Sequence, residues 1–178
     1  LAADLFQAMG ASVAQLPGGE IVPAMERGVI DGFEFNNPTS DRRFGAQDVA
    51  KNYMMGSHHQ ATEYFEIMFN KTKFNALPAE HKAILQYAAE AVSSANEWKA
   101  MDYYSKDLQE LISKDKVNVQ RTPKSVFDAQ IKAWDGLIAQ LGSDPFMKKV
   151  MDSQKAWVRR VVYYNMNNAT DYRGAFEH

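Results

Sequence analysis

The chain has 178 residues, of which 46% are hydrophobic and 24% charged, and its formal net charge is −2. These are ordinary proportions for a globular protein, and a domain of this length buries roughly 70% of its unfolded surface. The near-neutral charge predicts no nucleic-acid partner, and no stretch approaches the roughly 18 uninterrupted apolar residues of a membrane-spanning helix. The sequence contains no cysteine, which excludes disulfides, thiolate metal sites and thiol catalysis.

The first half of the chain has the signals of short strands mixed with short helices. Strand signals are runs of β-branched and aromatic residues bounded by Gly, Pro or Asn. Helix signals are apolar residues at every third or fourth position, with Gly as a stop. By these criteria we expect helices at 1–9 and 20–27 and a short one ending at 44, capped by Thr39 or Ser40, with strands at 11–16, 29–35, 52–57 and 63–70. The last of these runs is apolar on both faces, which predicts a central strand.

The second half predicts three helices, two of them very long. Apolar residues keep a helical period over about 35 residues after Pro78, which corresponds to a rod of roughly 50 Å. A brief strand is expected at 117–120 and a helix at 123–141, ended by Gly142. The final helix is expected to run from 145 to Tyr172. Its aromatic residues must be buried against a larger body or a second subunit.

The ends of the chain do not have the pattern of domain ends. The first helix begins at Leu1, so no earlier residue can cap its free N–H groups. Apolar residues continue almost to the last residue, with Tyr172 and Phe176. We therefore expect this chain to be part of a longer protein, with a frayed terminal helix as the alternative.

Few residues carry the pattern of a chemical site. The sequence contains no phosphate-binding glycine loop, no GxSxG and no HExxH. His58 and His59 are adjacent, and neighbouring side chains on a strand point to opposite faces, so they are not expected to hold one metal ion together. The expected arrangement is one histidine packed inward and one solvated. Gln60 follows them and could offer its amide to a small polar ligand.

Glu34 is the most informative of these residues, because it lies between Phe33 and Phe35. An unpaired carboxylate is costly to bury, so Glu34 requires a cation, hydrogen-bond donors or exposure to water. Two interpretations stay open on spacing alone. Glu34 either binds a hard metal ion or a substrate, or it is a polar residue on the exposed side of an alternating strand.

The run LPGGEIVPAMERGVIDGFEF, residues 16–35, resembles the substrate-binding proteins of tripartite ATP-independent periplasmic (TRAP) transporters. The resemblance continues through His59-Gln60, the segment FEIMFNKTKFNALPAEHKAIL at 65–85 and the long helices, and so it covers essentially the whole chain. It implies a type II periplasmic-binding-protein-like α/β lobe with a small mixed sheet, a long spine helix and a long C-terminal helix. Residues 1–142 would form the second lobe and the spine helices, and residues 143–178 a helix exchanged in a homodimer.

The resemblance is greatest to the branch that binds α-keto and α-hydroxy acids with Na⁺ or Ca²⁺. It implies that Glu34 and the carbonyl of Phe35 are metal ligands, although this branch usually has Trp in place of Phe35. Phe35, Asn37, His59 and Gln60 are the expected ligand-binding residues in this half. A glutamine metal ligand, the arginine that binds the substrate carboxylate and an export signal would all precede residue 1.

The function implied is a periplasmic receptor that delivers a small organic acid to TRAP membrane subunits and makes or breaks no bond. The alternative is a free-standing α/β interaction domain without a small-molecule ligand. An enzyme ranks third, because the sequence shows no nucleophile–base pair and no three-ligand metal set.

Overall fold

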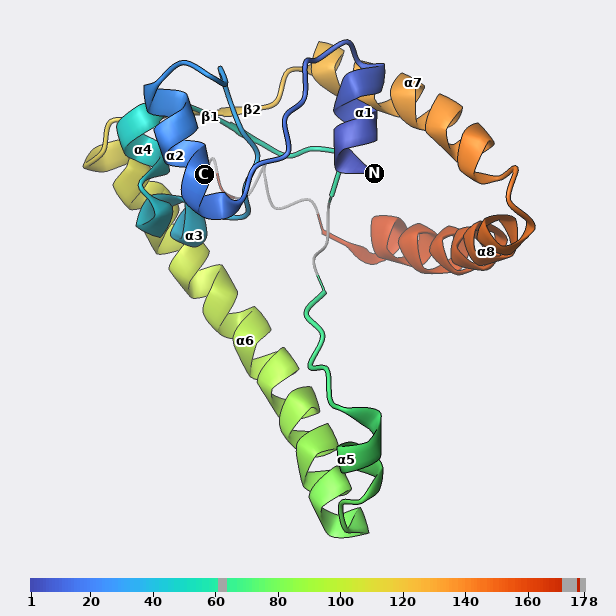
Figure 1. Ribbon diagram of the computed structural model, residues 1–178. Helices are drawn as coiled ribbons and strands as arrows, with labels where there is room; N and C mark the ends of the chain where they lie inside the picture. The colour runs from blue at the N-terminus through green and yellow to red at the C-terminus, as the bar shows by residue number, and fades with distance from the viewer. Residues whose placement is uncertain (61–63, 171–175, 177–178) are drawn as a thin grey trace.

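The computed structural model describes residues 1–60, 64–170 and 176. Within them the chain is mostly helical, and two short strands lie near the top of the molecule in Figure 1. The elements in chain order are α1 (Ala2–Ala8), α2 (Gly18–Glu26), α3 (Pro38–Phe44), α4 (Ala46–Val49), β1 (Asn52–Met55), α5 (Lys71–Asn75), α6 (Ala79–Ser113), β2 (Asn118–Arg121), α7 (Lys124–Leu141) and α8 (Pro145–Asn168).

The sheet consists of β1 and β2, which pair in parallel with Asn52 opposite Asn118. The strands expected at 52–57 and 117–120 are thus confirmed, and the sheet is small as predicted but parallel rather than mixed. The strands expected at 11–16, 29–35 and 64–70 are wrong for the described residues, which are irregular there. A strand exists only where another backbone offers hydrogen bonds, and no neighbouring strand does so for these runs in the part of the chain that the structure describes.

A packed body forms where α1, α2, α3 and α4 meet the sheet, α7 and the upper end of α6. In this body α3 lies against α6, α1 against α7, and α2 against α4. The buried apolar residues come from these elements and the turn before β2: Leu5, Ile21, Ala24, Ala46, Leu111 and Val117. The body therefore contains the hydrophobic core of the described chain.

An ionic contact joins α3 to the upper end of α6. The Arg42 guanidinium is 3.4 Å from the Asp107 carboxylate, 2.5 Å from that of Glu110 and 2.8 Å from that of Asp115. One arginine thereby connects two turns of α6 and the residues after it, and guanidinium groups are well suited to such multidentate pairing. This contact holds α3, and the loop before it, against the long helix.

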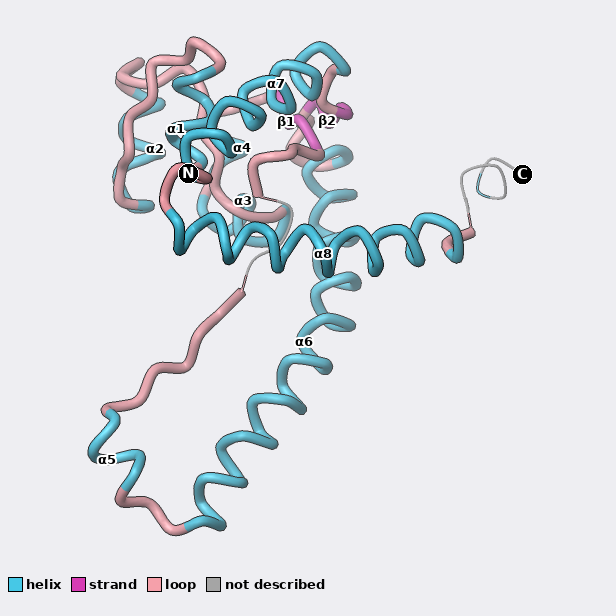
Figure 2. Tube along the Cα trace, turned by 90° about the vertical axis from the view of Figure 1, so that its right-hand side faces the viewer, coloured by secondary structure: helices cyan, strands magenta, loops and turns pink. Residues whose placement is uncertain are grey.

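Helix α6 continues far beyond the body, as Figure 2 shows. It has 35 residues, as the helical period predicts, and only Leu111 among them is buried. The irregular segment 64–70 and α5 lead into its lower end. In this segment Tyr64, Phe65 and Met68 are 86%, 81% and 85% exposed. We call α5, segment 64–70 and the lower part of α6 the arm.

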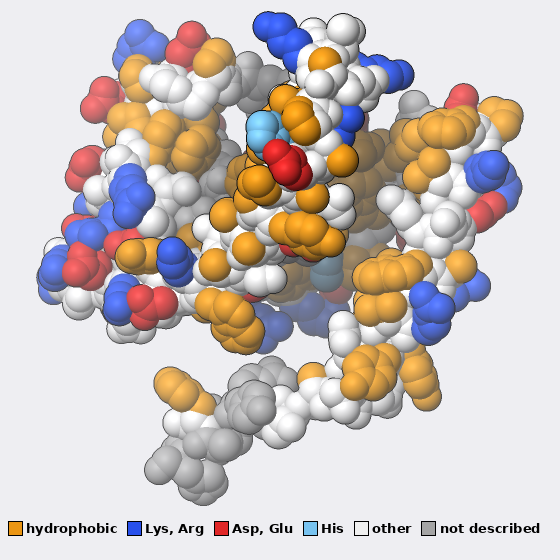
Figure 3. Space-filling model, turned by 90° about the horizontal axis from the view of Figure 1, so that it is seen from below, with side chains coloured by type: hydrophobic (Ala, Val, Ile, Leu, Met, Phe, Trp, Pro, Cys, Tyr) orange, Lys and Arg blue, Asp and Glu red, His pale blue; other side chains and the backbone are white. Residues whose placement is uncertain are grey.

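Helix α8 also leaves the body, and none of its residues is buried. It begins at Pro145 as expected and is capped by Asp144, whose side chain accepts a hydrogen bond from the Met147 N–H at 2.8 Å. It ends at Asn168, because the backbone of Ala169 is extended, so the predicted continuation is wrong at residues 169 and 170, while Tyr172 lies outside the described residues. Figure 3 shows hydrophobic side chains exposed over several elements of the face seen from below. Among the described helices, none is both long and apolar enough to cross a membrane.

Candidate functional site

The loop that carries Glu34 lies between α2 and α3. The ring of Phe35 stacks on Phe44 of α3, with centroids 4.4 Å apart and planes at 15°. The same ring covers the start of α2, where a Cβ atom on Gly18 would lie 3.4 Å from it. Phe35 thus fixes the loop between two helices, and the Glu34 side chain beside it is 47% exposed.

Asn37 ends this loop as the cap of α3. Its side-chain oxygen accepts a hydrogen bond from the Ser40 N–H at 2.9 Å, and its amide nitrogen donates to Asn36 Oδ1 at 2.7 Å. The predicted cap at Thr39 or Ser40 is wrong, because both residues lie inside α3. Capping requires an extended residue before the helix, and Asn37 is that residue. Its expected contact with a ligand stays a prediction.

Asp41 of α3 holds the Glu34 loop in place, and this role was not predicted from the sequence. It is 6% exposed, and its carboxylate accepts hydrogen bonds from the Asn36 N–H at 3.2 Å and the Tyr53 hydroxyl at 2.8 Å. Burial raises the pKa of Asp41, although these hydrogen bonds act in the opposite direction. Burial and the bond to Asp41 also raise the pKa of Tyr53. The pair ties the Glu34 loop to β1.

The structure brings Glu34 and His59 together. His59 follows β1, its side chain is 12% exposed, and its Nε2 lies 3.5 Å from Glu34 Oε1. Its ring packs on Phe6 of α1 with centroids 5.4 Å apart, while the exposed His58 packs on Phe127 of α7 at 5.1 Å. The two histidines therefore face different neighbours, as expected, although they lie in a bend rather than a strand. Gln60 is exposed next to His59.

The donor set tests whether these residues suit a metal ion. Hard cations such as Ca²⁺ take six to eight oxygen ligands. Glu34 offers a half-exposed carboxylate, and the backbone carbonyl of Phe35 and the amide of exposed Gln60 are oxygen donors of the same class. Nowhere in the described ranges do three or more His, Asp or Glu residues form a group that could hold a metal ion. The residues present fit one part of such a site, which needs further oxygen ligands.

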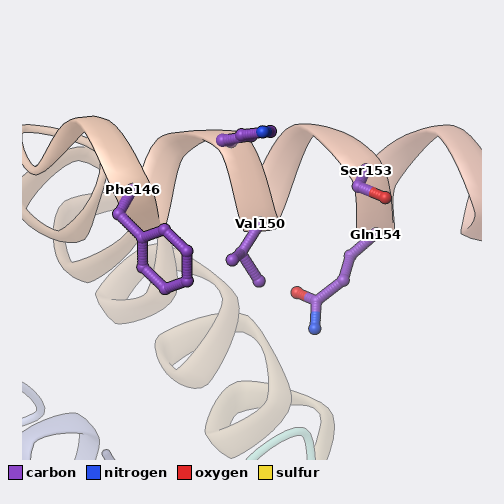
Figure 4. Close-up of a pocket in the computed structure, with 5 residues that line it drawn as sticks. Phe146, Val150, Ser153 and Gln154 are labelled. Atoms are coloured by element: carbon purple, nitrogen blue, oxygen red, sulfur yellow. The ribbon is translucent and has the colours of Figure 1, made fainter.

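Two shallow pockets of the described chain lie away from these residues. One is a shallow groove on α8, where Figure 4 shows Phe146, Val150 and Gln154 projecting from one face of the helix. Another lies between α1 and the end of α7 and includes Leu1 and Leu141. Because Glu34 is half-exposed and Gln60 is exposed, the candidate site lies at the surface of the body.

Comparison with known families decides what kind of protein this surface belongs to. The sequence profile of the family DctP, described as bacterial extracellular solute-binding protein, family 7, matches residues 1–141. The chain belongs to this family. It is a family of solute-binding proteins rather than enzymes, which confirms the predicted class of protein and the resemblance to TRAP receptors.

Two curated proteins are similar in sequence. A monocarboxylate 2-oxoacid-binding periplasmic protein of Nostoc sp. is 26% identical over 174 residues, which are 97% of this chain and 47% of that protein. A solute-binding protein of Sulfitobacter sp. is 35% identical over 88 residues, which are 49% of this chain and 26% of that protein. The match therefore spans about half the length of the Nostoc relative and about a quarter of the length of the Sulfitobacter relative.

Two crystal structures are similar in fold. A TRAP periplasmic solute binding protein from Colwellia psychrerythraea, with bound calcium and pyruvate, has a TM-score of 0.84 and 27% identity, and the match covers 94% of this chain and 52% of that one. A TRAP periplasmic solute binding protein from Pseudoalteromonas atlantica, with bound sodium and pyruvate, has a TM-score of 0.78 and 25% identity, covering 92% and 50%. The predicted fold class is thus confirmed.

Proposed function

We propose that the protein containing this chain is a TRAP receptor that binds a small α-keto or α-hydroxy monocarboxylate together with Na⁺ or Ca²⁺. The observation that carries the proposal is the placement of Glu34, half-exposed beside Phe35 and 3.5 Å from His59, on the surface of a solute-binding lobe. The pyruvate, calcium and sodium bound by the two structural relatives support this class of ligand.

In this proposal Glu34 and the Phe35 carbonyl hold the ion, and Asn37, His59 and Gln60 contribute to the ligand site. When bound, the cation neutralises part of the ligand's carboxylate charge. The stacking of Phe35 on Phe44 keeps the Glu34 loop in place before ligand arrives, which lowers the ordering cost of binding. Contacts made only when a second lobe meets the ligand would then shift the population toward a closed form.

We further propose that residues 1–142 form the second lobe with its spine helices, and that residues 143–178 form a separate unit. The family profile ends at residue 141, close to this boundary, which supports the division. We propose that the receptor acts in the periplasm and delivers its ligand to TRAP membrane subunits. The periplasmic relatives support this location and these partners.

The C-terminal unit is proposed to form a homodimer. Helix α8 has no buried residue, and its aromatic residues Phe146, Trp157 and Tyr163 are 71%, 56% and 71% exposed. Such a face is expected to be covered by a partner. Truncation after Gly142 should therefore convert the dimer to monomers on a sizing column, and a truncated protein that still elutes as a dimer would contradict the exchange.

The binding proposal is tested by thermal unfolding of the complete gene product. Pyruvate with Na⁺ or Ca²⁺ should raise the melting temperature, because a ligand that binds only the folded state stabilises it. Glu34→Gln should reduce the shift by removing the anionic metal ligand, while Glu66→Gln in segment 64–70 serves as a matched control. The proposal fails if no α-keto or α-hydroxy monocarboxylate raises the melting temperature. The ion role of Glu34 fails if the variant responds like the wild type.

A further inference from the structure

We infer that Gln130 on α7 is a positioning residue for the ligand site, holding the loop after β1 so that His59 faces Glu34. The inference rests on the proposed function, since it concerns the same site. Gln130 does not contact Glu34 itself, so any effect on binding must pass through the loop.

The side chain of Gln130 is polar and yet almost fully buried. It is 2% exposed, which places it with Leu5 and Leu111 among the most buried large side chains described. A buried amide is costly unless both its donor and its acceptor are satisfied. Both are satisfied by one loop: the oxygen accepts from the His58 N–H at 2.9 Å, and the nitrogen donates to Ser57 Oγ at 2.7 Å.

From Ser57 the contacts continue to the candidate site. The Ser57 hydroxyl accepts a hydrogen bond from the His59 N–H at 3.2 Å and also contacts His59 Nδ1. The opposite ring nitrogen of His59 lies 3.5 Å from Glu34. A continuous series of polar contacts thus runs from the interior of α7 to the proposed metal ligand. Because the amide accepts one of these bonds and donates the other to neighbouring residues of the loop, Gln130 favours the loop conformation that places the His59 ring beside Glu34.

Other residues of α7 reinforce the same loop. Trp134 donates its indole N–H to the His58 carbonyl at 2.7 Å, and Phe127 packs on the His58 ring. Phe127, Gln130 and Trp134 are spaced by three and four residues, so they share one face of the helix. Gly56 begins the loop with φ +87°, and a Cβ there would lie 3.4 Å from the Phe127 ring. This face of α7 therefore contacts each residue that leads to His59.

The test compares variants of the complete gene product. Gln130→Met keeps the length of the side chain and removes both hydrogen-bonding groups, and Gln140→Met makes the same change at an exposed position of α7. Calorimetric titration with pyruvate in the presence of CaCl₂ should show roughly 10- to 100-fold weaker binding for Gln130→Met, as is typical when an outer partner of a metal-site residue is lost. Gln140→Met should bind like the wild type.

A second readout does not depend on ligand. The ring nitrogen resonances of His59, assigned by their loss in His59→Ala, should shift in Gln130→Met and stay unchanged in Gln140→Met. If Gln130→Met does not fold, Trp134→Phe removes one bond to the same loop. It should move both readouts in the same direction by a smaller amount.

The outcomes separate this inference from the proposed function. If the wild type binds pyruvate and the folded Gln130→Met variant, or Trp134→Phe in its place, binds it equally well, the positioning role is overturned and the proposed function is not. If the wild type binds no acid, the proposed function fails, and the His59 resonances then decide the geometric claim. Unshifted resonances in Gln130→Met, or in Trp134→Phe where that variant replaces it, overturn the claim, and shifted ones support it.

Discussion

The body and the arm contain the same kinds of apolar residues, which are buried in the body and exposed in the arm. In the body, apolar side chains of α1, α2, α4 and α6 are buried, with Leu5 at 0% and Leu111 at 2% exposure. In the arm, Tyr64 and Phe65 stay more than 80% exposed, and Trp98 further along α6 is 71% exposed. The single helix α6 runs through both environments (Figure 1).

This contrast shows that an apolar pattern specifies a helix but not what covers it. A helix with an apolar face is stabilised mainly by the surface it packs against. At the upper end of α6 that surface is α3, held by Arg42. Along the arm the described residues provide no equivalent surface. The stability of the chain should therefore reside in the body. Two predictions test this, and a third compares the body with α8.

The largest effect is expected from Leu111→Ala. Removing this buried side chain should lower the free energy of unfolding by about 2–5 kcal/mol, since transfer and cavity costs add. Trp98→Ala removes a larger but exposed side chain on the same helix and should change the stability by no more than about 0.5 kcal/mol. Urea denaturation of both variants measures the difference. Equal losses would show that the arm is packed as tightly as the body.

A smaller effect is expected from the two asparagine caps. Asn37 caps α3 in the body, and Asn70 caps α5 in the arm through a 3.1 Å bond to the Lys73 N–H. Asn37→Ala should lower the global stability by about 1 kcal/mol. Asn70→Ala should leave it unchanged and instead speed amide hydrogen exchange within α5. A global loss in the Asn70 variant would mean that arm and body unfold as one unit.

The smallest expected effect is a pH dependence of the folding stability, which should have opposite signs at Asp41 and at Asp152. The pKa of Asp41 is raised in the folded protein, so the buried charge is a cost at pH 7 that disappears as pH falls through the folded pKa. The wild type should therefore gain stability relative to Asp41→Asn between pH 7 and pH 4. Asp152 on α8 has its pKa lowered, chiefly by its hydrogen bond with Lys148.

The Asp152 contribution should thus be present at neutral pH and lost as pH falls below the ordinary carboxyl range. The wild type should lose stability relative to Asp152→Asn only when the titration is extended below this range. Both gaps, meaning the differences in urea midpoint between the wild type and each variant, are measured at a series of pH values. Two gaps that move in the same direction would contradict the assigned environment of one carboxyl.

The longer helices were predictable from the sequence because their signals are local, whereas the short helices α4 and α5 were not predicted. The 35-residue period of α6, the Asp144 cap of α8 and the stop at Gly10, with φ +92°, are all encoded within a few residues. Strands were less predictable because each needs a partner elsewhere. Segment 64–70 has the composition of a central strand and remains irregular, whereas β1 forms because β2 lies beside it.

The sequence singled out two residues that lie close together in the fold, but not the residues that support them. Glu34 stands out between two phenylalanines, and His59, which the family resemblance names with it, lies 3.5 Å from it. Asp41 and Gln130 were missed because a buried polar residue looks like any surface residue in a single sequence. A polar residue inside an otherwise apolar helical face, as at Gln130 between Phe127 and Trp134, is the signal that could have revealed one of them.

The pairing of β1 with β2 has a consequence for how the chain folds. Asn52 and Asn118 are joined by a side-chain hydrogen bond of 3.0 Å across 66 residues of sequence. Closing so long a loop carries an entropic penalty that local helix formation does not. Helix α6 should therefore form early, while the sheet forms in a later, slower step. The β1–β2 pairing and the contact of α3 with α6 both close the chain segment that contains the arm, so both must open before the arm is released from the body.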